Sequence, residues 1–212
     1  MKQIVKCCLM AVALLCGSLN VANASEASKK SSAVKKEAKA KTKVSGKKSN
    51  KGLLKGYIDG ETAGDSYGYE VHAKDGVTNI LEQVGLYVSE GENPMQTMRF
   101  QVNVYDMKDV KKSPATQFVS VLPQPIEFVF DSKDVKSGKY IYKLPKSITL
   151  PQDAMVEIVF LDNLGDKKLW FKNKLVEKDT WMKSGDKEWI LQPFATPFFV
   201  EYEETAGIKD EE

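Results

Sequence analysis

The sequence contains few of the residue types that build disulfides, zinc sites and nucleophilic active sites. It has three cysteines, all before residue 17, and its single histidine is His72. Residues 25–212 therefore cannot form a disulfide or a thiolate metal site, and they offer no cysteine nucleophile. A zinc site built on several histidines is excluded as well.

Aromatic residues are missing from the first quarter of the chain, because all 9 Phe, 8 Tyr and 3 Trp lie beyond residue 56. Charge is divided in the same way. Residues 25–55 carry 11 lysines and two acids, whereas residues 56–212 carry 18 basic and 27 acidic residues. We therefore expect one folded domain, residues 56–206, after a disordered lysine-rich tail or linker. An acidic C-terminal tail, residues 207–212, follows it.

The N-terminus has the pattern of a secretory signal peptide, residues 1–24. Two lysines precede an apolar run over residues 7–19, and a small-x-small cleavage site ends at Ala24. The run is shorter than a membrane-spanning helix, and a lipoprotein signal at Cys16 is the alternative. The pattern predicts an exported protein. An exported domain without disulfides fits the periplasm or cell surface of a Gram-negative bacterium.

The lysine-rich tail has several open interpretations. Its charge suits an electrostatic arm for an anionic surface such as a membrane or an acidic glycan. It could equally be a solvated linker, or it could pair loosely with the acidic domain of its own chain. Nucleic acid is not expected as a partner, because the protein is predicted to be exported.

Alternation of apolar and polar residues with a period of two predicts strands throughout residues 56–206. In Thr97–Asp106, Met98, Phe100, Val102 and Val104 share one face, and Arg99, Gln101, Asn103 and Tyr105 share the other. Glycine-containing turns separate the runs, and at most a helical turn is expected near Glu177–Met182. The expected fold is all-β, a single two-sheet β-sandwich that is jelly-roll-like, with an immunoglobulin-like sandwich as the alternative. Further strands are expected around residues 67–73, 80–88, 126–130, 140–144, 156–160, 170–171, 189–191 and 198–202.

Three of these strands carry a family resemblance. Residues 98–106, MRFQVNVYD, resemble the central strand of a group of exported bacterial β-sandwich domains. Residues 140–145, YIYKLP, and 150–160, LPQDAMVEIVF, are similar to later strands of that group, with Tyr140 where the group usually has Trp. Such domains occur alone or beside carboxypeptidase-regulatory-like domains in envelope proteins. The resemblance implies a sandwich fold over residues 60–205 and export, and it supplies no catalytic residues.

The search for reactive groups gives no catalytic set. His72 lacks a Gly-x-Ser-x-Gly partner and a second histidine, so we expect a structural role for it. The segment Asp162–Asp166 and the acidic loop around Asp59 and Asp65 could offer oxygen ligands to Ca²⁺, but hairpin turns explain both equally well. We therefore expect no enzyme activity, no cofactor and no metal site.

Trp181 is the candidate ligand-binding residue, because it lies in the polar stretch KDTWMK and should be exposed. Trp170 and Trp189 lie in strand-like runs and should pack in the core. Arg99 should pair with an acid across the sheet, or bind a ligand carboxylate.

The sequence thus predicts a non-catalytic exported β-sandwich that binds a glycan or a protein of the bacterial envelope. A structural or assembly accessory subunit of an envelope complex is the alternative. A hydrolase that uses a pair of carboxylates fits less well, because no spacing in the sequence defines such a pair.

Overall fold

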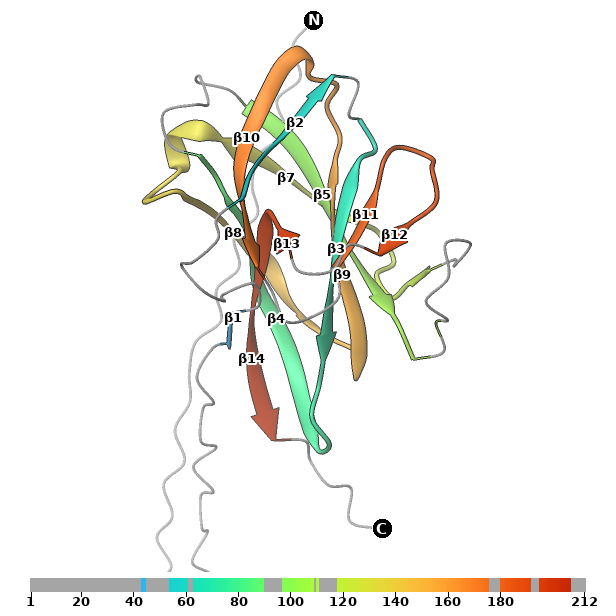
Figure 1. Ribbon diagram of the computed structural model, residues 1–212. Coiled ribbons are helices and arrows are strands. Elements are labelled where there is room, and N and C mark those ends of the chain that lie inside the picture. Colours follow the sequence, from blue (N-terminus) through green and yellow to red (C-terminus); the bar gives the residue numbers. More distant parts are fainter. Residues whose placement is uncertain are drawn as a thin grey trace, which may run out of the picture. The chain divides into compact units, whose positions relative to one another are not determined.

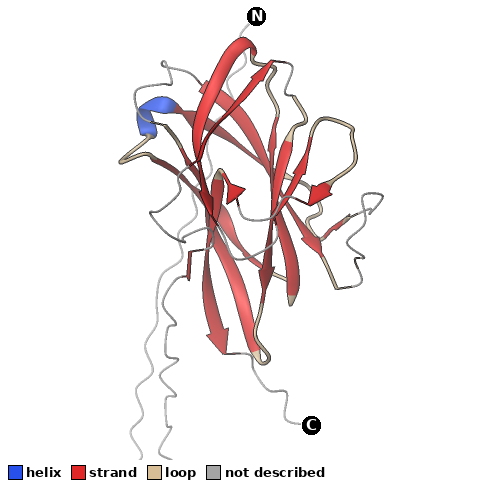
Figure 2. Cartoon of the chain, in the orientation of Figure 1, coloured by secondary structure: helices blue, strands red, loops and turns tan. Residues whose placement is uncertain are grey.

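The computed structural model describes residues 43–44, 54–60, 63–89, 97–108, 110, 118–175, 180–191 and 195–206. The predicted signal peptide, most of the lysine-rich tail and the acidic C-terminal tail lie outside these ranges. Within them the chain is an all-β sandwich, as predicted, and strands account for nearly all of its regular structure (Figure 2). The helical part of the described chain is one 3₁₀ turn, Ser132–Asp134.

Antiparallel pairing joins the strands into two main sheets (Figure 1). The four-stranded sheet has the order β1 (Lys43–Val44), β14 (Phe198–Ala206), β4 (Val77–Tyr87), β8 (Lys139–Thr149). The seven-stranded sheet has the order β12 (Ile190–Leu191), β11 (Thr180–Lys183), β3 (Ser66–His72), β9 (Asp153–Phe160), β5 (Thr97–Asp106), β6 (Val119–Ser120), and β7 (Ile126–Asp131) also pairs with β5.

A smaller sheet has the order β13 (Ala195–Thr196), β10 (Gly165–Leu175), β2 (Leu54–Gly60). A single bridge between Val88 and Phe171 connects β10 to the chain just after β4. The backbone N–H of Ser89 also donates to the carbonyl of Trp170 at 3.1 Å. The small sheet therefore continues the four-stranded sheet rather than forming a separate layer.

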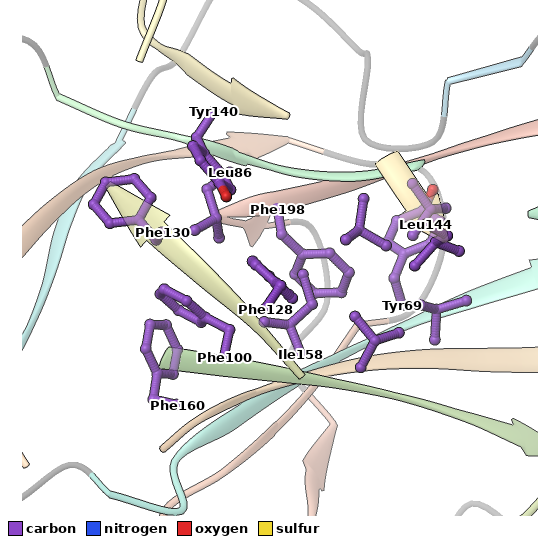
Figure 3. Close-up of a cluster of buried hydrophobic side chains, with 14 of the residues drawn as sticks. Tyr69, Leu86, Phe100, Phe128, Phe130, Tyr140, Leu144, Ile158, Phe160 and Phe198 are labelled. Atoms are coloured by element: carbon purple, nitrogen blue, oxygen red, sulfur yellow. The ribbon is translucent and has the colours of Figure 1, made fainter. Parts of the chain in front are cut away.

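The main core lies between the two large sheets and follows from the alternation of β5. Met98, Phe100, Val102 and Val104 are all at most 2% exposed, so the predicted apolar face of this strand is confirmed. Phe100 packs edge-on against Phe160, with ring centroids 4.7 Å apart. Figure 3 shows these rings beside Phe128, Phe130 and Ile158. Burying a large apolar side chain contributes about 1.5–3 kcal/mol, which explains how the domain folds without disulfides.

One local prediction is wrong. The segment predicted as a helical turn contains strand β11, in which Thr180 pairs with Tyr69 and Lys183 with Ser66. The pairing with β3 overrides a local sequence that has no clear strand alternation. Of the predicted lysine-rich tail, the described residues are Lys43–Val44, which form β1, and the start of β2 at Leu54, two residues before the predicted domain boundary.

Gly85 is required in the middle of β4, because another side chain occupies the space above it. A Cβ atom at this position would lie 2.3 Å from Cζ of Phe199 and 2.6 Å from the backbone oxygen of Tyr140. Phe199 is only 1% exposed although it lies on the outer face of the sheet. Its ring contacts Tyr87, with centroids 4.8 Å apart, and the Lys139 ammonium lies 5.7 Å from the ring centroid.

We expect Gly85→Ala to lower the free energy of unfolding by about 1–3 kcal/mol, because the added methyl group overlaps both the Phe199 ring and a backbone carbonyl. Denaturant unfolding measures this loss. The control Lys143→Ala changes an exposed residue on β8 and should alter stability by less than about 0.5 kcal/mol. An unchanged unfolding midpoint for Gly85→Ala would contradict the packing described.

Buried tyrosines make the fold sensitive to alkali. Burial raises the pKa of Tyr67, Tyr87 and Tyr140 from 10.0 to about 12. Below pH 10 these phenols are neutral in both the folded and the unfolded chain, so they contribute no pH dependence to the free energy of unfolding there. Between pH 10 and 12 the unfolded chain ionises first, and the free energy of unfolding falls as the pH rises.

We therefore expect alkaline unfolding to begin above pH 10, and we expect the three buried tyrosines to ionise as the protein unfolds. Tyrosinate absorbance and far-ultraviolet circular dichroism, followed together, measure this. Tyr140→Phe should move the transition to higher pH, provided that the fold tolerates loss of the hydrogen bond from its hydroxyl to the carbonyl of Val129. Ionisation of all tyrosines near pH 10 in a folded protein would be the contrary result.

Candidate functional site

The outer face of the seven-stranded sheet carries an unusual set of polar side chains. Strand register places Glu157 of β9 opposite Asn103 of β5 and Glu70 of β3 opposite Met155 of β9. Directly paired residues point to the same side of a sheet, and so do residues two apart along a strand. Glu70 and Glu157 are therefore diagonal neighbours on one face, and both are buried, at 2% and 1% exposure.

A second apolar cluster covers these carboxylates on the outside of the sheet. We call it the aromatic cap. The ring of Phe118 contacts Trp181 and Trp189, with centroids 5.6 Å and 5.3 Å away. Because these rings come from opposite ends of the sheet order, they span the face between β6 and β12. The cap comprises the buried residues Met107, Met155, Trp181 and Trp189, with Tyr105, Val110 and Phe118 packed against them.

Because Gly68 has no side chain, two residues of the cap can pack directly over it. A Cβ atom there would lie 2.5 Å from Sδ of Met155 and 3.3 Å from Cβ of Trp181. Gly68 pairs with Glu157 on one side and with Trp181 on the other. Glycine at this position therefore allows Met155 and Trp181 to close over the sheet.

Glu157 is held by two donors from β5. The Asn103 side-chain amide donates to Oε2 of Glu157 at 2.7 Å, and the Tyr105 hydroxyl donates to the same oxygen at 2.5 Å. Burial, followed by the nearby negative charge of Glu157, raises the pKa of Tyr105 far above its ordinary value. The phenol thus stays a neutral donor, and the carboxylate is fixed between two strands.

Glu70 is held by donors from the cap and from its own strand. The indole N–H of Trp181 donates to Oε1 of Glu70 at 2.8 Å, and Nε2 of His72 lies 3.1 Å from Oε2. The other ring nitrogen of His72, Nδ1, lies 2.7 Å from Oδ1 of Asp153. The imidazole thus bridges a buried and an exposed carboxylate, and it can donate to both only as the imidazolium.

This arrangement is well suited to fixing structure and poorly suited to acid–base chemistry. Both buried carboxylates accept hydrogen bonds from neighbouring side chains, and the aromatic cap covers them. Over the residues that the structure describes, no group of three His, Cys, Asp or Glu side chains is placed to hold a metal ion. The role predicted for His72, a structural one, agrees with its two carboxylate partners.

The predicted exposure of Trp181 is wrong. Its side chain is 1% exposed and lies inside the aromatic cap, because β11 places it opposite Gly68 with its indole N–H directed at Glu70. A buried ring offers no face for stacking on a sugar, so we do not retain Trp181 as a ligand-binding residue. Trp189 is buried as predicted, at 7% exposure. Trp170 is half-buried, with the Lys168 ammonium 5.8 Å from its ring centroid.

The acidic loops act as turns in the structure. Asp162 accepts from the backbone N–H of Arg99 at 2.6 Å and from Nε of Arg99 at 2.9 Å, which confirms the predicted pairing of Arg99 with an acid. Asn163 accepts from the backbone N–H of Gly165 at 2.7 Å, as in an Asx turn. Asp65 accepts from the backbone N–H of Gly185 at 2.8 Å, and partial burial raises the pKa of Asp65. The side chain of Asp59 lies outside the described residues.

Exposed aliphatic residues follow two residues of the aromatic cap in the chain. Val119 follows Phe118 in the chain and is 74% exposed, and Ile190 follows Trp189 and is 58% exposed. Leu191 is 39% exposed. By strand register, Val119 pairs with Asp106 and Ile190 with Met182, so both point to the sheet face opposite that of the cap. Leu191 pairs with Trp181 and points to the cap side. We call Val119, Ile190 and Leu191 the apolar rim.

The hydrogen bond between Trp181 and Glu70 should stabilise the cap. We expect Trp181→Phe to lower the free energy of unfolding by about 1–3 kcal/mol, because it removes a donor to a buried carboxylate. A double-mutant cycle with Glu70→Leu should give a coupling energy of about 0.5–3 kcal/mol. The control Trp189→Phe trims a cap residue whose ring contact is with Phe118. Additive effects of Trp181→Phe and Glu70→Leu would show that the bond contributes nothing.

No helix in the described part of the chain is long and apolar enough to cross a membrane. Comparison of the chain with protein-family models, with curated proteins and with solved structures found no match.

Proposed function

We propose that this protein is a non-catalytic, exported binding module that recognises a protein component of the bacterial cell envelope. The contact surface is the apolar rim, formed by the exposed aliphatic residues of β6 and β12 at the two ends of the seven-stranded sheet order. The observation that carries the proposal is the exposure of Val119 and Ile190, at 74% and 58%, next in the chain to the cap residues Phe118 and Trp189. Grouped exposed aliphatic residues on a rigid support are typical of protein–protein contact sites.

The rim favours a protein over a glycan as the partner. Sugar rings are recognised by exposed aromatic faces, and the aromatic residues of the cap are turned inward, with Trp181 and Trp189 both at most 7% exposed. Aliphatic side chains instead match an apolar protein surface. The hydrogen bonds to Glu70 and Glu157 fix the cap residues that precede the rim strands in the chain, so little ordering entropy is lost when a partner binds.

Export is proposed on the sequence of the first 24 residues, which has the features of a cleaved signal peptide. The absence of cysteine beyond residue 16 agrees with a domain that is stable in an oxidising compartment without disulfides. The lysine-rich segment after the signal peptide would then connect the domain to, or hold it away from, an anionic envelope surface.

The alternative role, an assembly subunit that joins a complex by strand addition, needs an open sheet edge. Strand β8 ends the order of the four-stranded sheet in the described part of the chain, and Ile141 on it is 49% exposed. However, Lys139, Lys143 and Lys146 are also exposed there, next to Pro145. Charged residues and proline on an edge strand oppose further pairing, so this edge gives the alternative less support.

A carboxylate-based hydrolase has the least support. Such an enzyme needs two carboxyl groups that face a common cleft. The described hollow between the β3–β4 turn and the β8–β9 corner has a volume of about 330 Å³ and a single carboxylate, Asp75, in its lining. The two buried carboxylates lie elsewhere, under the cap.

The rim can be tested with Ile190→Asp in the full-length chain. The variant should capture about tenfold less protein partner than the parent chain does from a detergent extract of the envelope. The reason is that a charge in an apolar contact is strongly unfavourable. Val129→Asp is the matched control, since Val129 is 54% exposed on β7, away from the cap. Protease treatment of the extract should abolish capture, whereas glycosidase treatment should not. Equal capture by both variants, or loss only after glycosidase treatment, would refute the proposal.

A further inference from the structure

Strand β14 has two edges, and they are used very differently. One edge pairs with β4 along the whole of β14, from Phe198 opposite Leu86 to Ala206 opposite Val77. On the other edge, the described pairing is limited to β1, in which Lys43 lies opposite Tyr202 and Val44 opposite Glu201 (Figure 1). A two-residue strand thus occupies the edge of a nine-residue strand.

We propose that this outer edge of β14 is a strand-addition site and that its occupant is the chain's own lysine-rich segment, docked in cis by charge as well as by backbone pairing. Main-chain hydrogen bonds supply the generic part of such binding, and side chains supply the selectivity. The selectivity here is for a basic, extended segment.

The charges on the two strands are complementary. Strand β14 carries Glu201, Glu203 and Glu204 within its nine residues. The ammonium of Lys43 forms an ion pair with Glu204, and this hydrogen bond is the main cause that raises the pKa of Lys43. Lys74, in the turn after β3, lies 4.0 Å from the other oxygen of Glu204. Glu204 is only 17% exposed, so it is the partly buried centre of this small basic–acidic cluster.

The opposite edge of the same sheet shows why the segment docks on β14. Exposed lysines and a proline line β8, so that edge repels a lysine-rich strand and opposes pairing with any strand. The acidic edge of β14 attracts such a strand. The two parts of the chain have the same opposite charges as the two strands. Residues 25–55 have a net charge of +9, and residues 56–212 have a net charge of −9.

The length of chain between β1 and β2 favours docking within one molecule. Residues 45–53 span at most about 30 Å when fully extended, and β2 is fixed by its pairing with β10 from Gly60 to Leu54. The segment around Lys43 is therefore tethered close to the domain at a high effective concentration, typically millimolar for a short linker. A second copy would have to compete with this at its bulk concentration.

Hydrogen–deuterium exchange of the full-length chain tests the proposal. In Lys43→Glu and in Glu204→Lys, the amides of β1 should exchange about two- to fivefold faster than in the parent protein, as expected when an ion pair between an exposed lysine and a partly buried glutamate is lost. The exchanged pair, Lys43→Glu with Glu204→Lys, should restore much of the protection. Amides of β5 and β9 report whether each variant is folded.

Lys146→Glu is the matched control, because it makes the same change in net charge on β8, at the other edge of the sheet. It should leave exchange in β1 unchanged. Added salt should accelerate exchange of the β1 amides in the parent protein, and it should not do so in the variants that lack Lys43 or Glu204. Equal effects of Lys146→Glu and Lys43→Glu, or no rescue by the exchanged pair, would overturn the proposal. Protection that rises with protein concentration would overturn it in favour of docking between two copies.

Discussion

The structure depends on the way β5 and β9 bury both of their faces. Alternation along β5 sends Phe100 and Val102 into the main core, as in any half-buried strand. Its other face is also covered, because Asn103 and Tyr105 donate to the buried Glu157. A buried carboxylate is tolerated only when its oxygens accept hydrogen bonds. These bonds fix the positions of the three side chains, and the aromatic cap closes over them. The second, smaller core is therefore built around a charge.

The same constraint explains where the surface is available for binding. Trp181 and Trp189 point inward to shield the carboxylates and to pack against Phe118. Backbone alternation turns the next residues, Ile190 after Trp189 and Val119 after Phe118, to the other side of the strand, and both are exposed aliphatic residues. The proposed contact surface is thus a consequence of the cap, since the register that buries one residue exposes the next.

Much of the fold was predictable from the sequence because its strands alternate strongly. The predicted strand Thr97–Asp106 coincides with β5. Local pattern could not reveal β11, whose residues TWMK lack alternation and become a strand only by pairing with β3. The cap was missed for a related reason, because Trp181 is flanked by polar residues and its burial depends on Gly68, which is 113 positions earlier in the chain. The one available signal was Glu157, an acid between apolar residues in the strand AMVEIVF.

The distribution of charge along the chain also determines how the edges of the four-stranded sheet are protected. A sandwich with open edges must prevent uncontrolled strand addition, and the four-stranded sheet meets this need in two ways. Strand β8 carries lysines and a proline, which oppose any added strand, whereas β14 carries glutamates, which oppose an acidic strand and accept a basic one. A chain whose folded domain is acidic can therefore supply a fitting strand only from its lysine-rich segment. The proposed docking of that segment would cover the outer edge of β14 and leave the remaining lysines available for an anionic surface.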